Sequence, residues 1–177
     1  MNQLFSFINS MDLIWIIPVL LFIHELEEWN ILTWYKKYFV NLPASTETSV
    51  KIHIFTLGVA AFLLTLIARI APLIIANILI LFLSGFVLTN TIQHIIQTFQ
   101  YKTYAPGLIT GIITVAGCVF VNIILVRDGM IYLPFYAILL LGVPAVINTI
   151  KLKHQMTPEL RRVHEFFIRV EKWVGRN

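Results

Sequence analysis

The chain has 177 residues, of which 58% are hydrophobic and only 12% are charged, whereas soluble domains carry roughly 25% charged residues. A water-soluble core of this size has no room for so many apolar side chains, so the composition excludes a soluble globular protein and makes lipid the solvent for much of the surface. The single cysteine, Cys118, excludes a disulfide framework, and the net charge of +4 is interpreted as the basic face of a membrane protein, not as a nucleic-acid-binding surface.

Five apolar segments are long enough to cross a membrane as helices, which takes about 20 residues. They cover approximately residues 12–34, 53–69, 73–99, 106–126 and 131–150. The sequence therefore predicts an all-α fold: a polytopic membrane helix bundle of five transmembrane helices that forms a single domain over residues 1–177.

Residues 157–175 have a different pattern. Thr157 followed by Pro158 is typical of a helix start, with threonine as the cap and proline at the first helical position. Apolar residues then recur every three or four positions, with arginines and a lysine between them. This pattern predicts a basic amphipathic helix on the cytoplasmic side, lying on the membrane surface or packed beneath the bundle.

The lysines and arginines predict the orientation of the bundle, because they concentrate on the cytoplasmic side of membrane proteins. With five spans and a cytoplasmic C-terminus, Arg69 and Arg127 are the only two of the thirteen that fall outside. We therefore expect a multi-pass protein of the cell membrane, with its N-terminus outside and its C-terminus in the cytoplasm.

The first apolar segment contains one histidine and three carboxylates within five residues. A charged residue at the centre of a span costs roughly 2.5–3.5 kcal/mol on a translocon scale, so such residues usually face the bundle interior and mark function. On a helix, His24, Glu27 and Glu28 share one face, whereas Glu25 is turned about 100° away. Three ionisable side chains on one buried face repel each other or pair poorly, and a metal ion bound between them removes this repulsion. The alternative is a protonated carboxylate hydrogen-bonded to His24, which serves structure or proton relay.

Further polar residues are expected at the same depth. Asn90, His94 and Gln97 form a polar stripe near the cytoplasmic end of the third segment. The loop that follows carries Tyr104, and His53 begins the second segment on the same side. Because these separate segments converge on one membrane depth, we expect them to complete a site with the carboxylates of the first segment, with His53 as an additional metal-ligand candidate.

Three motifs give the chain a resemblance to a known family. H-x-x-E-E, N-x-x-x-H and Y-x-P-G occur in this order, formed by His24, Glu27 and Glu28, by Asn90 and His94, and by Tyr104, Pro106 and Gly107. The chain resembles the family of small bacterial membrane proteins named for its HXXEE motif, and the match covers most of its length. The resemblance implies a catalytic site without an assigned reaction; His53 lies in none of the three motifs.

Our first interpretation of the cluster is a mononuclear zinc site. His24 and Glu28, one helical turn apart, would bind zinc with His94 as the third protein ligand, leaving the fourth position to water. The spacing is similar to the H-x-x-E-H pattern of inverted zincins, with glutamate in place of the second histidine. Glu27 is also a candidate ligand, and its proposed role is to take a proton from the bound water.

This interpretation predicts a hydrolase of a lipid-like amide or ester. Asn90 and Tyr104 would steady an oxyanion or orient the ligand. The expected partners are membrane lipid and a lipid-like or small hydrophobic substrate, with no nucleic acid. Zinc is the expected divalent metal, and iron or manganese are the alternatives.

Two other interpretations remain open at the level of sequence. A diiron or dimanganese oxidoreductase would need more carboxylates, in Glu-x-x-His pairs from two helices, than these segments supply. A non-enzymatic metal or proton transporter or sensor would use the same cluster, although no polar path along several segments accompanies it.

Overall fold

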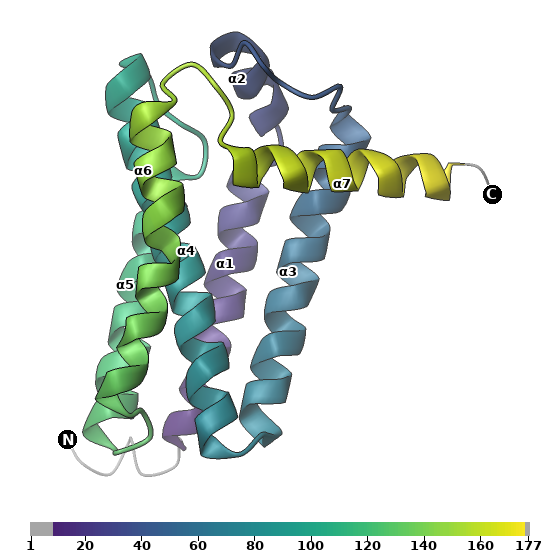
Figure 1. Ribbon diagram of the computed structural model, residues 1–177. Helices are drawn as coiled ribbons and strands as arrows, with labels where there is room; N and C mark the ends of the chain where they lie inside the picture. Colours follow the sequence, from purple (N-terminus) through teal and green to yellow (C-terminus); the bar gives the residue numbers. More distant parts are fainter. Residues whose placement is uncertain (1–8, 176–177) are drawn as a thin grey trace.

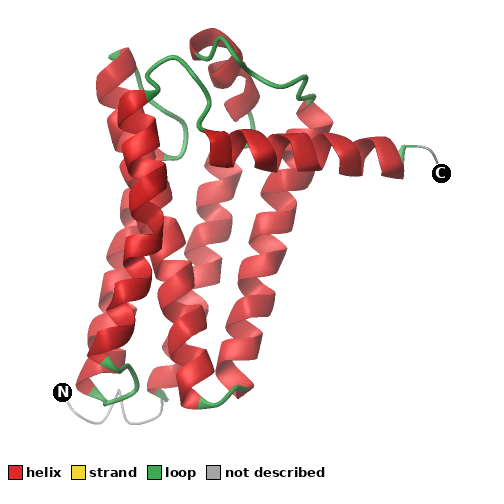
Figure 2. Cartoon of the chain, in the orientation of Figure 1, coloured by secondary structure: helices red, strands yellow, loops and turns green. Residues whose placement is uncertain are grey.

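The computed structural model describes residues 9–175, and these residues form helices joined by short loops, without a strand (Figures 1 and 2). The elements, in chain order, are η1 (Ser10–Trp15), α1 (Ile16–Glu27), α2 (Ile31–Tyr38), α3 (Glu47–Ile70), α4 (Leu73–Tyr101), α5 (Leu108–Arg127), η2 (Leu133–Gly142), α6 (Val143–Lys151) and α7 (Pro158–Val174).

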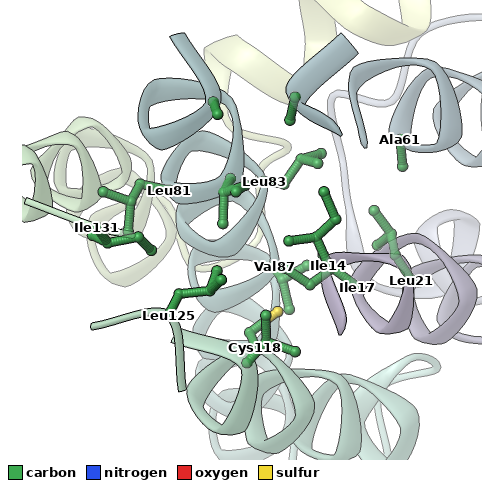
Figure 3. Packing of buried hydrophobic residues seen from close by; sticks show 14 residues of the cluster. Ile14, Ile17, Leu21, Ala61, Leu81, Leu83, Val87, Cys118, Leu125 and Ile131 are labelled. Carbon is green, nitrogen blue, oxygen red and sulfur yellow. The ribbon is translucent and has the colours of Figure 1, made fainter. Parts of the chain in front are cut away.

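The long helices run along one another as a bundle, and α7 crosses one end of it, where α2 also lies (Figure 1). α1 packs between α3 and α5, and η2 packs against α4. Figure 3 shows the apolar core that these helices enclose, to which Ile17, Leu21, Leu81, Val87 and Leu125 contribute. Many large apolar side chains outside the core remain exposed, as expected for a surface that faces hydrocarbon.

Four helices of the described chain are long and apolar enough to cross a membrane: α3, α4, α5 and the continuous helix formed by η2 and α6. This arrangement is compatible with a multi-pass membrane protein. The all-α bundle predicted from the sequence is confirmed, whereas the prediction of five such helices is confirmed only for four.

The first predicted span is wrong in its second half. A single helix was expected over residues 12–34, but α1 ends at Glu27 and residues 28–30 form a turn before α2 begins. Glu28 and Asn30 have backbone angles outside the helical region, with ψ values of 1° and 20°. The turn separates the apolar α1 from the shorter α2, which lies beside α7.

The second predicted span begins earlier than expected. α3 starts at Glu47, because the side chains of Thr46 and Ser49 each accept a hydrogen bond from the other residue's backbone N–H, a capping box. Within the segment 157–175, where an amphipathic helix was predicted, α7 runs over Pro158–Val174, with Thr157 accepting from the Leu160 N–H and Pro158 in the first turn.

The basic residues separate between the two ends of the bundle. Arg69 ends α3 and Arg127 ends α5, both at the end opposite to α7. Arg176 lies outside the described residues. The remaining lysines and arginines lie in α2, α6, α7, the first turns of α3 and the adjoining loops. The end of the bundle that carries α7 is therefore the strongly basic one.

Candidate metal centre

Three ionisable side chains meet inside the bundle near its α7 end. His24 and Glu28 come from the last turn of α1 and its cap, and His94 comes from α4. Oε1 of Glu28 lies 3.0 Å from Nε2 of His24 and 2.7 Å from Nε2 of His94. All three side chains are buried, and their ligand atoms lie within 4.8 Å of one another.

The His24 ring is held by contacts on both of its nitrogens. Its Nδ1 is 3.2 Å from Oγ1 of Thr110, and its Nε2 is 2.8 Å from Nδ2 of Asn90. The Thr110 hydroxyl donates to the Glu27 carboxylate, so its oxygen accepts the Nδ1–H of His24. A neutral imidazole that donates its Nδ1–H to Thr110 carries its lone pair on Nε2, which faces Nδ2 of Asn90 and Oε1 of Glu28.

This tautomer has a consequence for the neighbouring carboxylate. Two lone-pair-bearing atoms, Nε2 of His24 and Oε1 of Glu28, face each other at 3.0 Å in a buried environment. Such a contact is repulsive unless a cation lies between the atoms. A metal-bound histidine typically donates its other ring N–H to an oxygen, and Thr110 provides that oxygen for His24.

Gly107 keeps the space beside the three side chains open. It has a φ of +94°, which other residues rarely adopt. A Cβ atom at this position would lie 2.7 Å from Oε1 of Glu28 and 2.9 Å from both Cε1 of His24 and Nε2 of His94. The glycine of the Y-x-P-G motif therefore leaves a small cradle against the carboxylate and both imidazoles.

The donor set, two imidazoles and one carboxylate, is one that a tetrahedral zinc ion accepts. Bonds of about 2.0–2.1 Å to zinc place neighbouring ligand atoms about 3.3 Å apart in a tetrahedron. The two contacts of Glu28 with the histidines are a few tenths of an ångström shorter than that spacing. Nδ1 of His94 is buried without a hydrogen-bond partner in the described structure, so the His94 ring is less firmly held than the His24 ring.

Glu27 does not belong to this group of three. One of its carboxylate oxygens accepts from the Tyr104 hydroxyl, and the other accepts from the backbone N–H of Thr110 at 3.0 Å and from its hydroxyl. The geometry therefore does not favour Glu27 as a metal ligand, nor as the base that takes a proton from metal-bound water. Glu27 and Tyr104 instead hold Thr110, and through it the His24 ring.

His53 is also outside the group of three. Its ring packs on Phe167 of α7 with a centroid distance of 4.8 Å, and lies 5.9 Å from the ring of His164. Asn90, by contrast, lies within reach of the centre: its Nδ2 is 3.4 Å from Oε1 of Glu28.

The structure adds residues that the sequence did not point to. Glu25 was expected to face away from the cluster, but it is only 2% exposed and lines a cavity beside Glu28 and His94. Thr110 holds His24, and no motif of the sequence marks it. The only available signal for Gly107 was its place in a motif, since its role depends on contacts with α1 and α4.

A cavity of about 440 Å³ adjoins the centre. Its walls come from α3, α4, η2, α6 and α7, together with Glu25 and Glu28. The three side chains are therefore accessible from a space large enough for a small organic molecule.

Comparison with known proteins identifies one family. The model of the family described as "Protein of unknown function with HXXEE motif" matches residues 15–121, which is more than half of the chain. No curated protein and no solved structure matches the chain. The matched region includes His24, Glu28, His94 and Gly107 and ends before α7.

Proposed function

We propose that this chain, which belongs to the HXXEE-motif family, binds one divalent metal ion, zinc, through His24, Glu28 and His94 and hydrolyses an amide or ester of a lipid. The observation that carries the proposal is the contact between Nε2 of His24 and Oε1 of Glu28 at 3.0 Å. A neutral His24 that donates its Nδ1–H to Thr110 has no proton on Nε2 for this contact. Two histidines and one glutamate form a known catalytic zinc set with an open fourth position.

The residues around the centre have distinct proposed roles. His24, Glu28 and His94 would hold the zinc ion, which would supply a lowered pKa for a bound water and polarisation of a carbonyl group. Thr110 fixes the His24 tautomer, and Glu27 with Tyr104 fixes Thr110, so these are positioning residues. Asn90 is placed to donate its amide N–H to an oxyanion beside the ligands, an interaction that typically contributes about 2.7–4 kcal/mol in hydrolases.

We further propose that η1 and α1 together form a fifth membrane crossing. Their 3-10 and α-helical turns over Ser10–Glu27 give a length of about 30 Å, the thickness of the hydrocarbon layer. The basic end of the bundle, with α2 and α7, would then lie in the cytoplasm. This orientation places the N-terminus outside the cell membrane and the metal centre in the inner leaflet, where lipid head groups can reach it.

A second candidate reaction follows from the same ligands. Two histidines and one carboxylate with open positions are also the ligand set of mononuclear non-haem iron oxygenases. A dinuclear centre has less support, because Glu28 is the only carboxylate in the group found among residues 9–175. The identity of the bound metal therefore distinguishes hydrolysis from oxidation.

The proposal is tested by metal analysis together with an activity assay. Protein purified in detergent from metal-replete cells should contain close to one zinc per chain, and Glu28→Ala should contain little. His154→Ala, which changes an exposed histidine far from the ligands in sequence, is the matched control and should retain the metal. Incubation with membrane lipid extracts should yield free fatty acid only with the zinc-loaded protein. Wild-type protein without bound metal would overturn the proposal; bound iron with an oxidised lipid product would select the second candidate.

A further inference from the structure

The cavity beside the metal centre extends far beyond the three ligands. Along α4 it is lined from Phe82 to Tyr101, a distance of about 28 Å at 1.5 Å per residue. Because Tyr101 ends α4 and Phe82 lies in its first half, the cavity reaches from the α7 end of the bundle towards the middle of the long helices. A small polar substrate would leave most of this length empty.

The chemical character of the cavity changes along this length. The lining residues of α4 near α7 are polar, namely Thr89, Asn90, Gln93, His94, Gln97 and Gln100. Further from α7, Phe82 and Phe86 of α4 are joined by Leu57 of α3 and by Ile138 and Leu141 of η2. The polar groups of the cavity thus gather around the metal ligands, opposite apolar side chains of α2, α3 and α7. The other end has an apolar lining and lies about 18 Å away, judged from the 12 residues between Phe82 and His94. We refer to these as the polar end and the apolar end.

The polar end contains an unpaired carboxyl group. Glu25 is 2% exposed and lines the cavity, yet no side chain or backbone group among residues 9–175 is hydrogen-bonded to its carboxyl group. A buried polar group normally has such a partner. A ligand that carries an amide N–H or a hydroxyl next to its reactive carbonyl would supply one.

The two ends of the cavity differ in what covers them. At the polar end, Leu160, Val163 and Phe167 of α7 contribute to the wall, so α7 separates this end from the cytoplasmic side. At the apolar end the wall reaches the surface of the bundle, where Phe82 is 46% exposed and Leu141 is 70% exposed. These exposed side chains belong to helices that are apolar enough to span a membrane.

We propose that this cavity binds a lipid with a single hydrocarbon chain and an amide in its head group, which enters from the membrane between α3 and η2. Its amide N–H pairs with Glu25, its carbonyl group lies beside His94 and Glu28, and its chain follows α4 towards Phe82. The inference rests on the proposed function only for the reaction at the carbonyl group; binding of the chain does not require the metal. The hydrocarbon chain of the lipid moves from the membrane interior into an apolar groove, so it gains little free energy from leaving water. The length of the groove therefore limits which hydrocarbon chains fit.

The test is photo-crosslinking with a defined probe. A hexadecanoyl amide of ethanolamine with a diazirine near the end of its chain is incorporated into phosphatidylcholine nanodiscs with wild-type protein, with and without prior chelation of metal. Peptide mapping should find the label on the apolar end of the cavity, around Phe82, Phe86 and Ile138. Excess unlabelled hexadecanoyl amide should reduce labelling at least tenfold, whereas the butanoyl amide should not.

Two variants separate the cavity from the rest of the lipid-facing surface. Ala145→Phe places a ring in the cavity wall and should reduce labelling of the cavity at least tenfold. Ala116→Phe makes the same change at an exposed position of α5 that does not line the cavity, and should leave labelling unchanged. Zinc content, measured on every sample, reports whether the metal centre is intact.

The outcomes distinguish this inference from the proposed function. Specific labelling that persists after chelation supports the lipid groove whether or not metal is found. Labelling spread evenly over lipid-facing residues, unaffected by the unlabelled amide, overturns the groove even if one zinc per chain is present. Competition on wild-type protein gives this answer without any variant, so misfolding of Ala145→Phe does not remove the test.

Discussion

The polar cluster around Asn122 and the His24–Glu28–His94 cluster are both buried in the helix bundle, and they differ in how completely their hydrogen bonds are made. Asn122 donates to Oγ of Ser84 at 3.0 Å and to the Cys118 carbonyl at 2.8 Å, and its Oδ1 accepts from the Tyr136 hydroxyl at 3.1 Å. In the His24–Glu28–His94 cluster, by contrast, two lone pairs face each other and Nδ1 of His94 has no partner within the described chain.

The difference teaches how to separate structural from functional polar groups in a membrane protein. A satisfied amide such as Asn122 joins helices and needs nothing more. A cluster that is incomplete without a cation, and that also opens onto a cavity, indicates a binding site. The following predictions test this distinction, beginning with the largest expected effect.

Gly107→Ala should abolish metal binding. The new Cβ would lie within 2.9 Å of atoms of His24, Glu28 and His94, so it fills the space that the ion requires. Elemental analysis of the purified protein measures the loss. Gly129→Ala is the matched control, because Gly129 also has a positive φ but a Cβ there meets nothing within 4 Å. Equal metal loss in both variants would mean that backbone strain, not crowding, is responsible.

Thr110→Val should weaken metal binding by about 10–100-fold, the usual effect of removing a residue that orients a metal ligand. The substitution removes the oxygen that accepts the Nδ1–H of His24 while it preserves the shape of the side chain. Titration against a competing chelator measures the affinity. Thr65→Val, which removes a buried hydroxyl without a hydrogen-bond partner among residues 9–175, should leave the affinity unchanged. Unchanged affinity in Thr110→Val as well would contradict the assigned tautomer.

Asn122→Ala should reduce stability and leave metal binding intact. Hydrogen bonds between membrane helices contribute about 0.6 kcal/mol on average and up to about 1.7 kcal/mol, and the substitution removes the bonds to Ser84, Cys118 and Tyr136. Unfolding in mixed micelles gives the change in the free energy of unfolding. Loss of zinc from this variant would show that the two clusters are coupled and would break the comparison.

Lowering the pH should loosen α7 through His164. Burial, and to a lesser extent nearby His53, lowers the pKa of His164 to about 4, with Glu28 opposing; its Nδ1 lies 2.9 Å from the Ser45 hydroxyl. Because the pKa is lower in the folded state than the usual 6.5, the docked helix is favoured above pH 6.5 and loses this stability as the pH falls towards 4.

Distances between spin labels on α3 and α7 measure this loosening. The α3–α7 distance should broaden in wild-type protein between pH 6.5 and 4.5, and the change should be smaller in His164→Phe, which keeps an aromatic ring without a titrating group. Identical broadening in both proteins would assign the effect to other groups.

The parts of the fold that the sequence predicted are those determined by local signals. Thr157 and Pro158 mark the start of α7, and four of the long helices follow from apolar length. The end of α1 was missed because residues 28–30 contain neither glycine nor proline. Asn30, the N-cap of α2, is the one local signal of a new helix start in this turn. The earlier start of α3 depends on a capping box formed with Ser49, in place of the commoner glutamate or glutamine.

The candidate site was predictable only in part. The first and third predicted spans cross the membrane in the same direction, which predicted that His94 would lie near Glu28. Nε2 of His94 is 2.7 Å from Oε1 of Glu28. Glu27 was predicted to lie on the site face, and Glu25 was predicted to face away from it. The positions of both side chains depend on how α1 packs between α3 and α5, which covers α1 on more than one face. Glu27 faces α5 and is held by Thr110 and Tyr104, whereas Glu25 faces the cavity. Helix periodicity shows that Glu25 and Glu27 lie on different faces of α1, but it does not show which face lines the site.

X-ray absorption spectroscopy of the zinc-loaded protein tests the central claim most directly. The account predicts a zinc edge whose fine structure contains two imidazole ligands and oxygen ligands at about 2.0–2.1 Å, and the loss of one imidazole in His94→Ala. A wild-type protein that holds no zinc under saturating conditions, or a spectrum with both imidazoles still present in His94→Ala, would contradict it.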